Sequence, residues 1–279
     1  MIRVGVAGYG YWGPNLARNL NASGRFELVA VADRSQAARQ LAARSHRGLT
    51  LLEDAMDLTR LAELDAVVVA TPVDSHYPIA LAAKAGRVLM VDHTFLFTGS
   101  LQIIDRTVRA GQLGKICYFD SMRVNLGLFQ PDVNCLWDLA PHDLSVINHL
   151  MKDDIIAIDV SGYCHVNPTL PDMVYLTLHY VNDVVAHFNL SWMSPVKVRR
   201  FAIGGTSRML IWDDLDQDQK IRIYNSGIEF HTEDERRAVI PDYRIGDILS
   251  PRVPRHEALL GVVNHFADVI ERKAASIMD

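Results

Sequence analysis

The feature that most constrains the fold is a glycine-rich turn near the start of the chain. The apolar run Ile2–Ala7 is typical of a short buried strand, and Gly8-Tyr9-Gly10-Tyr11-Trp12-Gly13 follows it directly. A helical stretch from about Trp12 to Asn21 comes next, and the acidic residue Asp33 lies 20 residues beyond the last glycine. A strand, a G-x-G-x-x-G turn, a helix and a later acid together predict a dinucleotide-binding unit.

Each glycine of this turn has a separate expected task. Gly8 permits the tight turn, Gly10 lets the backbone approach a pyrophosphate, and Gly13 allows the helix to pack closely on the strand. The start of the helix then offers free N–H groups and the positive end of its dipole to the phosphates. We therefore expect Tyr11 and Trp12, together with the three glycines, to border the cofactor. The alternative is a glycine-rich turn that binds nothing.

The residues at the end of the next predicted strand bear on the choice of cofactor. Asp33 can accept hydrogen bonds from ribose hydroxyls, and its negative charge disfavours a 2′-phosphate, so NAD is expected. Arg34 stands beside it and can pair with such a phosphate, which leaves NADP open.

Apolar strands and helices alternate through the first 114 residues. Further strands are predicted at 26–32, 65–70 and 87–91, and helices at 36–44, 77–85 (ended by Gly86) and 99–110. Continuously apolar strands that alternate with helices predict an α/β fold in which a parallel sheet is covered on both faces. Residues 1–114 are therefore expected to form a Rossmann-type domain.

The pattern changes in residues 115–279, where period-two alternation dominates. Met173–Tyr180 and Val184–Trp192 are predicted to pair through a turn at Val181-Asn182-Asp183, and a helix over 256–273 follows near the end. We expect an α+β substrate-binding and oligomerisation domain with a mostly antiparallel open sheet. An uncovered sheet face favours a homodimer or homotetramer.

Composition excludes several other classes of protein. With 28 basic and 33 acidic residues the formal net charge is −5, so nucleic acid is not an expected partner. Three scattered cysteines fit a reducing compartment rather than a disulfide framework, and no metal-binding pattern occurs. No apolar run is long enough to span a membrane, and the start of the chain does not read as a signal peptide. A cytoplasmic location is expected.

Several motifs in order resemble the Gfo/Idh/MocA family of NAD(P)-dependent oxidoreductases, which act on sugars, cyclitols and nucleotide sugars. They are the glycine-rich fingerprint, Ala70-Thr71-Pro72 with His76, and Trp137-Asp138-Leu139-Ala140-Pro141-His142-Asp143. Two further runs resemble a branch of this family that is often met in sugar-modifying pathways. They are Gly10–Asn15 and Asn125-Leu126-Gly127-Leu128-Phe129. The resemblance implies cofactor contacts from Thr71, Pro72 and His76, and a catalytic role for Asp138 and His142, with the histidine moving the proton.

The chain also departs from the family pattern. Family members usually carry a Glu-Lys-Pro motif whose lysine is counted as catalytic, and this sequence has none. Against the family pattern, one strand–helix unit is expected to be missing near residue 86. This sequence ends at Asp279, where relatives usually continue into a further helix. If the predicted 87–91 strand takes the vacant place, Asp92 and His93 stand where Glu-Lys usually stands. Otherwise His93 is an ordinary strand-end residue.

Asp138 and His142 are four residues apart, so both project from one face of a helix. We expect them in its first turn, where the helix dipole disfavours imidazolium and Asp138 favours it. Pro141 is tolerated in such a turn. The alternative roles are structural: Asp138 as the helix N-cap and His142 as a buried, satisfied histidine.

Other polar residues are candidates for binding substrate. Asn125, Asp132 and Asn134 flank the histidine motif, and Lys197 begins a basic cluster with Arg199 and Arg200 that can hold nucleotide-sugar phosphates. The alternative is that Asp132 and Asn134 lie in an ordinary solvated loop and that the basic cluster lies on a solvated strand face. The sequence thus favours an NAD(P)-dependent sugar or nucleotide-sugar oxidoreductase. A catalytically impaired relative that binds a nucleotide or a partner, or an NAD-dependent glycosidase, stays open.

Overall fold

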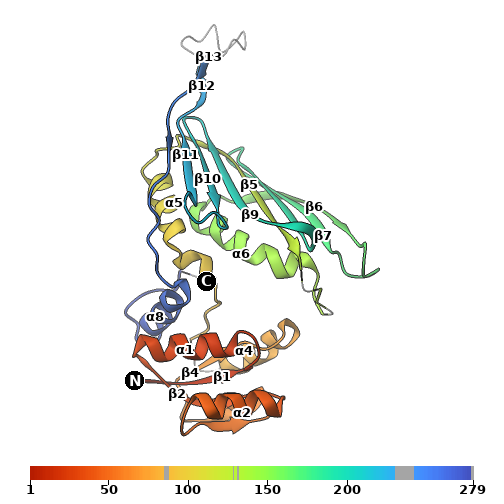
Figure 1. Ribbon diagram of the computed structural model, residues 1–279, viewed down its shortest axis with the longest axis vertical. Helices are drawn as coiled ribbons and strands as arrows, with labels where there is room; N and C mark the ends of the chain where they lie inside the picture. The colour runs from red at the N-terminus through yellow and green to blue at the C-terminus, as the bar shows by residue number, and fades with distance from the viewer. Residues whose placement is uncertain (85–87, 128, 131, 230–241, 278–279) are drawn as a thin grey trace. The chain divides into compact units, whose positions relative to one another are not determined.

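The apolar runs in the first part of the chain form a parallel sheet, as predicted. Its strands stand in the order β3-β2-β1-β4 and are β1 (Ile2–Ala7), β2 (Phe26–Ala32), β3 (Thr50–Leu52) and β4 (Ala66–Val69). In this computed structural model residues 1–84, 88–127, 129–130, 132–229 and 242–277 are described (Figure 1). The inner strands are buried because helices cover both faces of the sheet.

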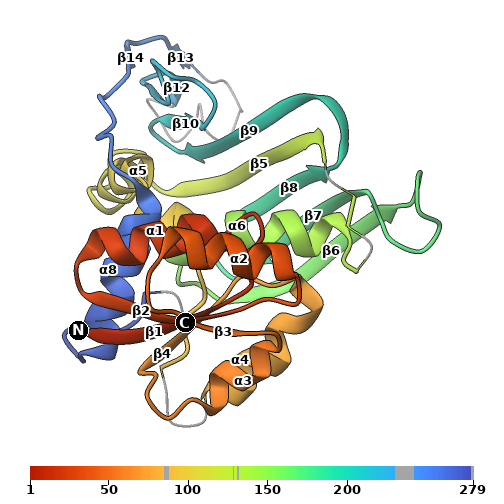
Figure 2. The same ribbon diagram turned by 60° about the horizontal axis from the view of Figure 1, so that its bottom comes forward.

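Helices α1 (Gly13–Ser23) and α2 (Gln36–Ser45) lie on one face, and α3 (Ala55–Arg60) and α4 (His76–Lys84) on the other (Figure 2). Ser35 caps α2, because its side chain accepts a hydrogen bond from the Ala38 N–H. Our sequence reading did not include β3 and α3, which are only three and six residues long. The expected end of α4 at Gly86 lies outside the described residues.

The chain divides into two units at positions other than residue 114. Residues 1–97 pack with the chain from Glu257 onward, and residues 98–256 form the second unit. The last helix, α8 (Ala258–Ile270), therefore belongs to the first unit, whereas α5 (Gly99–Arg109) belongs to the second. Phe266 of α8 stacks on Phe26 with ring centroids 6.0 Å apart, and this apolar contact returns the helix to the sheet.

The second unit is built on an eight-stranded sheet in the order β14-β11-β10-β9-β5-β8-β7-β6. These strands are β5 (Ile116–Leu126), β6 (Ile155–Tyr163), β7 (Met173–Tyr180), β8 (Val185–Ser191), β9 (Met193–Gly205), β10 (Met209–Asp213), β11 (Ile221–Tyr224) and β14 (Ile248–Leu249). All neighbours are antiparallel except β5 and β8. A small hairpin of β12 (Gly227–Glu229) and β13 (Asp242–Arg244) stands apart from this sheet.

Helix α6 (Cys135–Leu150) lies across one face of the large sheet (Figure 1). Alternate residues of β7 are buried, as the period-two pattern predicts. The turn between β7 and β8 also forms where predicted, with Asp183 in the left-handed region at φ 64° and its N–H donating to the Tyr180 carbonyl. No helix in the part of the chain that the structure describes is long and apolar enough to cross a membrane.

Candidate functional site

The three glycines of the turn after β1 differ in what a side chain at each position would meet. Gly8 has φ +89°, and a Cβ there would lie 2.6 Å from the Ala70 carbonyl oxygen. A Cβ on Gly13 would overlap the Gly8 carbonyl oxygen. A Cβ on Gly10 would meet no atom within 4 Å. Gly8 and Gly13 are therefore required by the fold, whereas Gly10 leaves open space in front of the turn, as a ligand-binding turn needs.

Asp33 connects this turn to the end of β2. Its carboxylate accepts hydrogen bonds from the Tyr9 N–H (2.6 Å) and the Ser35 N–H (2.7 Å). The Arg34 side chain is exposed next to Asp33. The backbone carbonyls of Asp33 and Arg34 both accept hydrogen bonds from the Arg39 guanidinium. The carboxylate thus orders the glycine-rich backbone before any ribose contact is made.

The N-cap residue of α1 does not cap the helix with its side chain. Trp12 occupies this position, and its indole makes no capping hydrogen bond to the first N–H groups. Tyr11 and Trp12 are 82% and 59% exposed, and their rings meet edge to face at 5.3 Å. The helix N-terminus therefore keeps donors available for an anion, with two exposed aromatic rings beside it.

The Ala70-Thr71-Pro72 segment follows β4 and lies against the glycine turn. The Ala70 N–H donates to the Ala7 carbonyl (2.7 Å), and a ring nitrogen of His76 lies 2.6 Å from the Thr71 carbonyl oxygen. The Ser75 hydroxyl donates to Thr71 Oγ1 (2.8 Å). Thr71, Pro72 and His76 are thus gathered at the carboxyl end of the same parallel sheet as the turn, where open α/β folds bind ligands.

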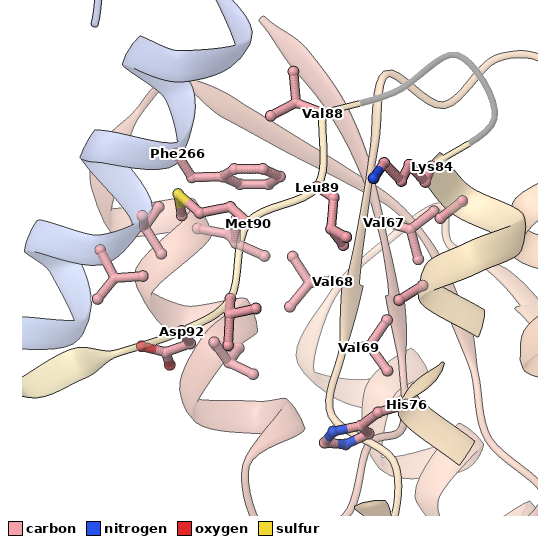
Figure 3. Close-up of a pocket in the computed structure, with 17 residues that line it drawn as sticks. Val67, Val68, Val69, His76, Lys84, Val88, Leu89, Met90, Asp92 and Phe266 are labelled. Atoms are coloured by element: carbon pink, nitrogen blue, oxygen red, sulfur yellow. The ribbon is translucent and has the colours of Figure 1, made fainter. Parts of the chain in front are cut away.

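The strand predicted at 87–91 does not form over the described residues 88–91. Instead, these residues line an apolar cavity of about 290 Å³. Figure 3 shows Val88, Leu89 and Met90 on one side of it and Val67, Val68 and Val69 of β4 on the other. The cavity lies between this segment and β4, and no strand pairing joins the two over the described residues. Among the described residues β4 is the last strand of its sheet.

Asp92 and His93 follow this irregular segment. Burial raises the pKa of the Asp92 carboxyl, although the residue keeps an exposed surface, and the Thr94 hydroxyl opposes the shift by donating to Oδ1 (2.8 Å). Burial lowers the pKa of the His93 imidazole. Both shifts favour the uncharged forms. The two residues do not stand at the end of a fifth strand, so the substitution for Glu-Lys that we considered lacks its expected scaffold.

In the second unit, α6 begins earlier than expected. Asn134 is its N-cap, and its Oδ1 accepts a hydrogen bond from the Trp137 N–H (3.1 Å). The N-cap role considered for Asp138 is therefore wrong, and Asn134, expected as a sugar ligand, has its oxygen engaged in capping. Pro141 and His142 lie inside the helix beyond its first turn, where the dipole has little effect.

Asp138 has a partner that our sequence reading missed. Its Oδ2 accepts a hydrogen bond from the indole N–H of Trp192 (3.0 Å), a residue only 2% exposed between β8 and β9. His142 is half-buried one helical turn further on. No motif in the sequence marks Trp192, because the contact joins positions 54 residues apart.

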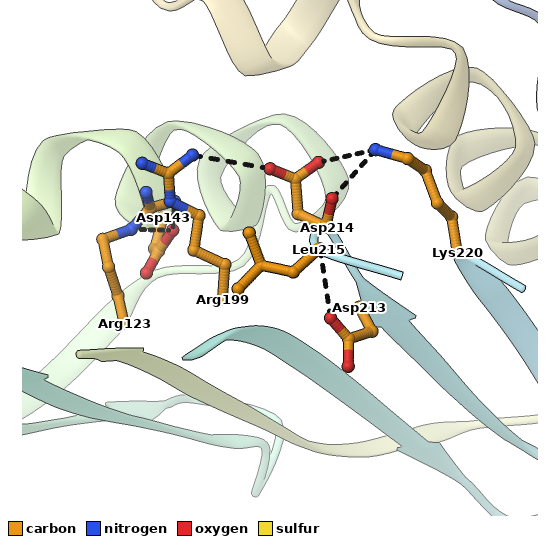
Figure 4. A network of polar contacts seen from close by, with 7 residues as sticks. All are labelled: Arg123, Asp143, Arg199, Asp213, Asp214, Leu215 and Lys220. Atoms are coloured by element: carbon orange, nitrogen blue, oxygen red, sulfur yellow. Dashed lines mark hydrogen bonds and ion pairs between the residues drawn. The ribbon is translucent and has the colours of Figure 1, made fainter. Parts of the chain in front are cut away.

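The helix that carries Asp138 and His142 is anchored to the sheet by a buried ion pair. Asp143 accepts hydrogen bonds from Arg123 of β5 (2.5 and 3.0 Å; Figure 4). It also accepts one from the hydroxyl of Ser121 on the same strand (2.7 Å). The Arg123 and Asp143 side chains are 7% and 6% exposed. This contact fixes the rotation of α6 next to His142.

The basic residues of β9 do not form one patch. Arg199 pairs with Asp214 (3.6 Å), which also contacts Lys220 (Figure 4). Lys197 is exposed on the same strand face, whereas Arg200 projects from the opposite face. Of the other substrate candidates, Asn125 is half-buried near the end of β5 and Asp132 is exposed in the loop before α6.

Comparison with known families agrees with both halves of this description. Residues 2–107 match the family described as the oxidoreductase family with an NAD-binding Rossmann fold. Residues 101–211 match the GFO/IDH/MocA C-terminal domain.

Individual relatives give the same result. The chain is 26% identical over 181 residues to an uncharacterized oxidoreductase, YdgJ, of Escherichia coli K12, covering 50% of this chain and 51% of that protein. It is 32% identical over 134 residues to inositol 2-dehydrogenase 1 of Saccharopolyspora erythraea, a match that covers 45% of this chain and 40% of that protein. The matches thus span about half the length of these curated relatives or less. The solved UDP-N-acetylglucosamine 3-dehydrogenase of Acidithiobacillus ferrooxidans shares the fold, with a TM-score of 0.77 at 21% identity over 100% of this chain and 91% of that one.

Proposed function

Because the chain belongs to the Gfo/Idh/MocA oxidoreductase family, we propose that it transfers a hydride between a nicotinamide cofactor and a carbinol or keto carbon of a sugar or nucleotide sugar. The observation that carries this proposal is the turn Gly8–Gly13, in which the missing Gly10 side chain leaves space for a ligand. The cofactor supplies the hydride acceptor, and the protein supplies binding, orientation and proton transfer.

In this proposal the first unit holds the dinucleotide. Backbone N–H groups at the start of α1 bind the pyrophosphate, and Asp33 accepts from the ribose hydroxyls. The Asp33 carboxylate favours NAD over NADP, and Arg34 is the residue that admits NADP. Thr71, Pro72 and His76 border the cofactor at the end of β4.

In the second unit His142 takes the hydroxyl proton as the sugar carbon is oxidised and returns it in the reverse reaction. Asp138, four residues earlier on the same face of α6, orients the substrate hydroxyl or the imidazole. The Trp192 indole holds the Asp138 carboxylate in place. His93 is a further candidate for proton transfer. Asn125, Asp132, Asn134 and Lys197 are retained as candidate sugar contacts.

Two relatives support a sugar-like substrate, since one is an inositol 2-dehydrogenase and another a UDP-N-acetylglucosamine 3-dehydrogenase. We also propose that the protein works in the cytoplasm as a homodimer or homotetramer. The support for assembly is the face of the large sheet opposite α6, which has no helix over it within the described residues.

A second function is favoured by two observations. The sequence lacks Glu-Lys-Pro, and the cavity beside β4 lies where a further strand would pair. A catalytically impaired family member would bind a nucleotide or a partner and leave sugars unchanged. Where it binds the cofactor, this alternative differs from the oxidoreductase only in turnover.

The two functions are separated by a calorimetric titration with NADH and then NADPH, followed by turnover assays on sugars and nucleotide sugars. Binding with turnover supports the oxidoreductase, and binding without turnover of any substrate class supports the impaired relative. Folded protein that binds neither cofactor would overturn the oxidoreductase and leave a non-catalytic relative that binds a partner.

A further inference from the structure

A second pocket, of about 430 Å³, lies in the second unit beside Trp192. Its volume is in the range of small-molecule sites. The lining consists of five apolar side chains, among them Trp192, Phe129 and Val166, and of the amides of Gln130 and Asn167. No lysine, arginine, histidine or carboxylate belongs to this lining as the structure describes it.

Trp192 joins this pocket to the candidate catalytic residues. One part of its indole lines the pocket, and its N–H donates to Asp138 Oδ2 (3.0 Å). The ring meets Phe129 at a centroid distance of 5.5 Å and an interplanar angle of 66°. A side chain at Gly127 would overlap the same ring. Trp192 is therefore held in one orientation between the pocket and α6.

The 165–172 loop, which lines part of the pocket, is ordered by a buried carboxylate. Asp172, whose side chain is 1% exposed, accepts hydrogen bonds from the N–H groups of His165 (2.7 Å) and Val166 (2.8 Å), and lies 2.7 Å from His165 Nδ1. The Asp172 backbone carbonyl accepts a hydrogen bond from the backbone N–H of Trp192 (2.9 Å). One residue thus ties the 165–172 loop to Trp192, so that the pocket is preorganised for a ligand.

The lining selects an uncharged group that is apolar at one end and carries a hydrogen-bond acceptor. A phosphate or carboxylate would find no cation in the described lining to pair with. Asn167 Oδ1 already accepts from the Thr169 N–H (2.9 Å) and hydroxyl (2.8 Å). Its Nδ2 therefore remains to donate to a ligand carbonyl. An acylamino group has a carbonyl of this kind next to a methyl that suits Val166 and Trp192.

We propose that this pocket binds the acylamino substituent of an amino-sugar substrate and places the sugar ring next to Asp138. This assignment rests on the proposed function and makes it more specific, since it separates N-acylated sugars from plain hexoses and inositols. Any phosphate of a nucleotide sugar must lie outside the pocket.

Saturation-transfer NMR with N-acetyl-D-glucosamine and D-glucose as probes tests the proposal, with and without NADH. We expect the acetyl methyl to receive the strongest saturation and glucose to bind at least about tenfold more weakly, because a lost hydrogen bond and a lost methyl contact each weaken binding. Val166→Trp fills the pocket and should reduce N-acetyl-D-glucosamine binding at least tenfold. Val181→Trp is the matched control, since Val166 and Val181 are 59% and 60% exposed.

The outcomes separate this proposal from the proposed function. Equal binding of the two sugars, no binding of either, or wild-type binding by Val166→Trp would overturn the pocket assignment, even in protein that binds NADH. Failure of the wild type to bind NADH would count against the oxidoreductase, while the acetyl-methyl signal would still be read in the samples without cofactor.

Discussion

At the scale of single residues, the glycine turn separates what the fold requires from what a ligand requires. Gly10→Val should leave the melting temperature close to that of the wild type, because its side chain would enter open space. The same change should weaken NADH binding at least tenfold. Gly13→Val should instead unfold the protein, since its Cβ overlaps the Gly8 carbonyl. Thermal melting and calorimetry check both, and wild-type NADH affinity in Gly10→Val would contradict a cofactor at this turn.

Asp33 tests the choice of cofactor. Asp33→Asn keeps an oxygen for the Tyr9 or Ser35 N–H but removes the charge that disfavours a 2′-phosphate. We expect the ratio of NADPH to NADH affinity to rise about tenfold, the effect of about 1.4 kcal/mol of binding free energy. Arg34→Ala is the complementary control, and it should lower NADPH affinity alone. An unchanged ratio in Asp33→Asn would place the ribose elsewhere.

His142 is the residue on which turnover should depend. His142→Ala should reduce kcat by about 10²–10⁴-fold, the usual contribution of general acid–base catalysis, with NADH affinity unchanged. His179→Ala is a suitable control because this histidine lies on β7 of the same unit and pairs with Asp159 (2.8 Å). Turnover at the wild-type rate in His142→Ala would exclude it as the proton-transfer group.

At the scale of elements, α6 depends on the buried pair Arg123–Asp143. Arg123→Met should destabilise the protein by about 3–5 kcal/mol, because it leaves a buried carboxylate without its counter-ion. Replacing both residues, as Arg123→Met with Asp143→Leu, should recover much of this loss. Urea unfolding measures both. Asp57→Asn, which breaks an exposed pair with Arg60, should cost less than about 1 kcal/mol.

At the scale of the whole molecule, the chain returns to its first unit through α8. Glu257, just before this helix, accepts hydrogen bonds from Arg18 and Asn19 of α1, and these bonds lower the pKa of the Glu257 carboxyl to about 2. A lowered acid pKa stabilises the fold above the ordinary value of 4.5, and this stability is lost as the pH falls toward 2. The Glu257 and Arg18 side chains are 43% and 56% exposed, so solvent screens the pair.

Glu257→Gln should therefore lower the unfolding free energy by only about 0.2–1 kcal/mol at pH 7. The difference from the wild type should shrink between pH 4.5 and 2 and vanish below that range, because the wild-type carboxyl is then protonated as well. Urea midpoints measured across this range check the sign. A difference that persists in full below pH 2 would mean that packing, rather than charge, accounts for the effect of Glu257.

The sequence by itself determined the features that depend on neighbouring residues. The glycine turn, the apolar strands β1, β2 and β4, and the β7–β8 hairpin each have a local signal, since backbone conformation and side-chain periodicity are set within a few residues. The family motifs are likewise short runs of neighbouring residues, namely the glycine turn, the Ala70-Thr71-Pro72 segment after β4 and Trp137–Asp143 in α6, so the fold class and the family were predictable from the sequence. Asn134 also had a local signal as a cap, which we assigned instead to Asp138.

Only the tertiary structure decided what depends on distant contacts. The segment 88–91 has the composition of a strand, but it lies across the cavity from β4 and does not pair with it. The return of α8 to the first unit and the bond between Trp192 and Asp138 join positions far apart in the chain. Such contacts gain their free energy from burial and geometry that exist only once the whole unit has packed, and no local pattern records them.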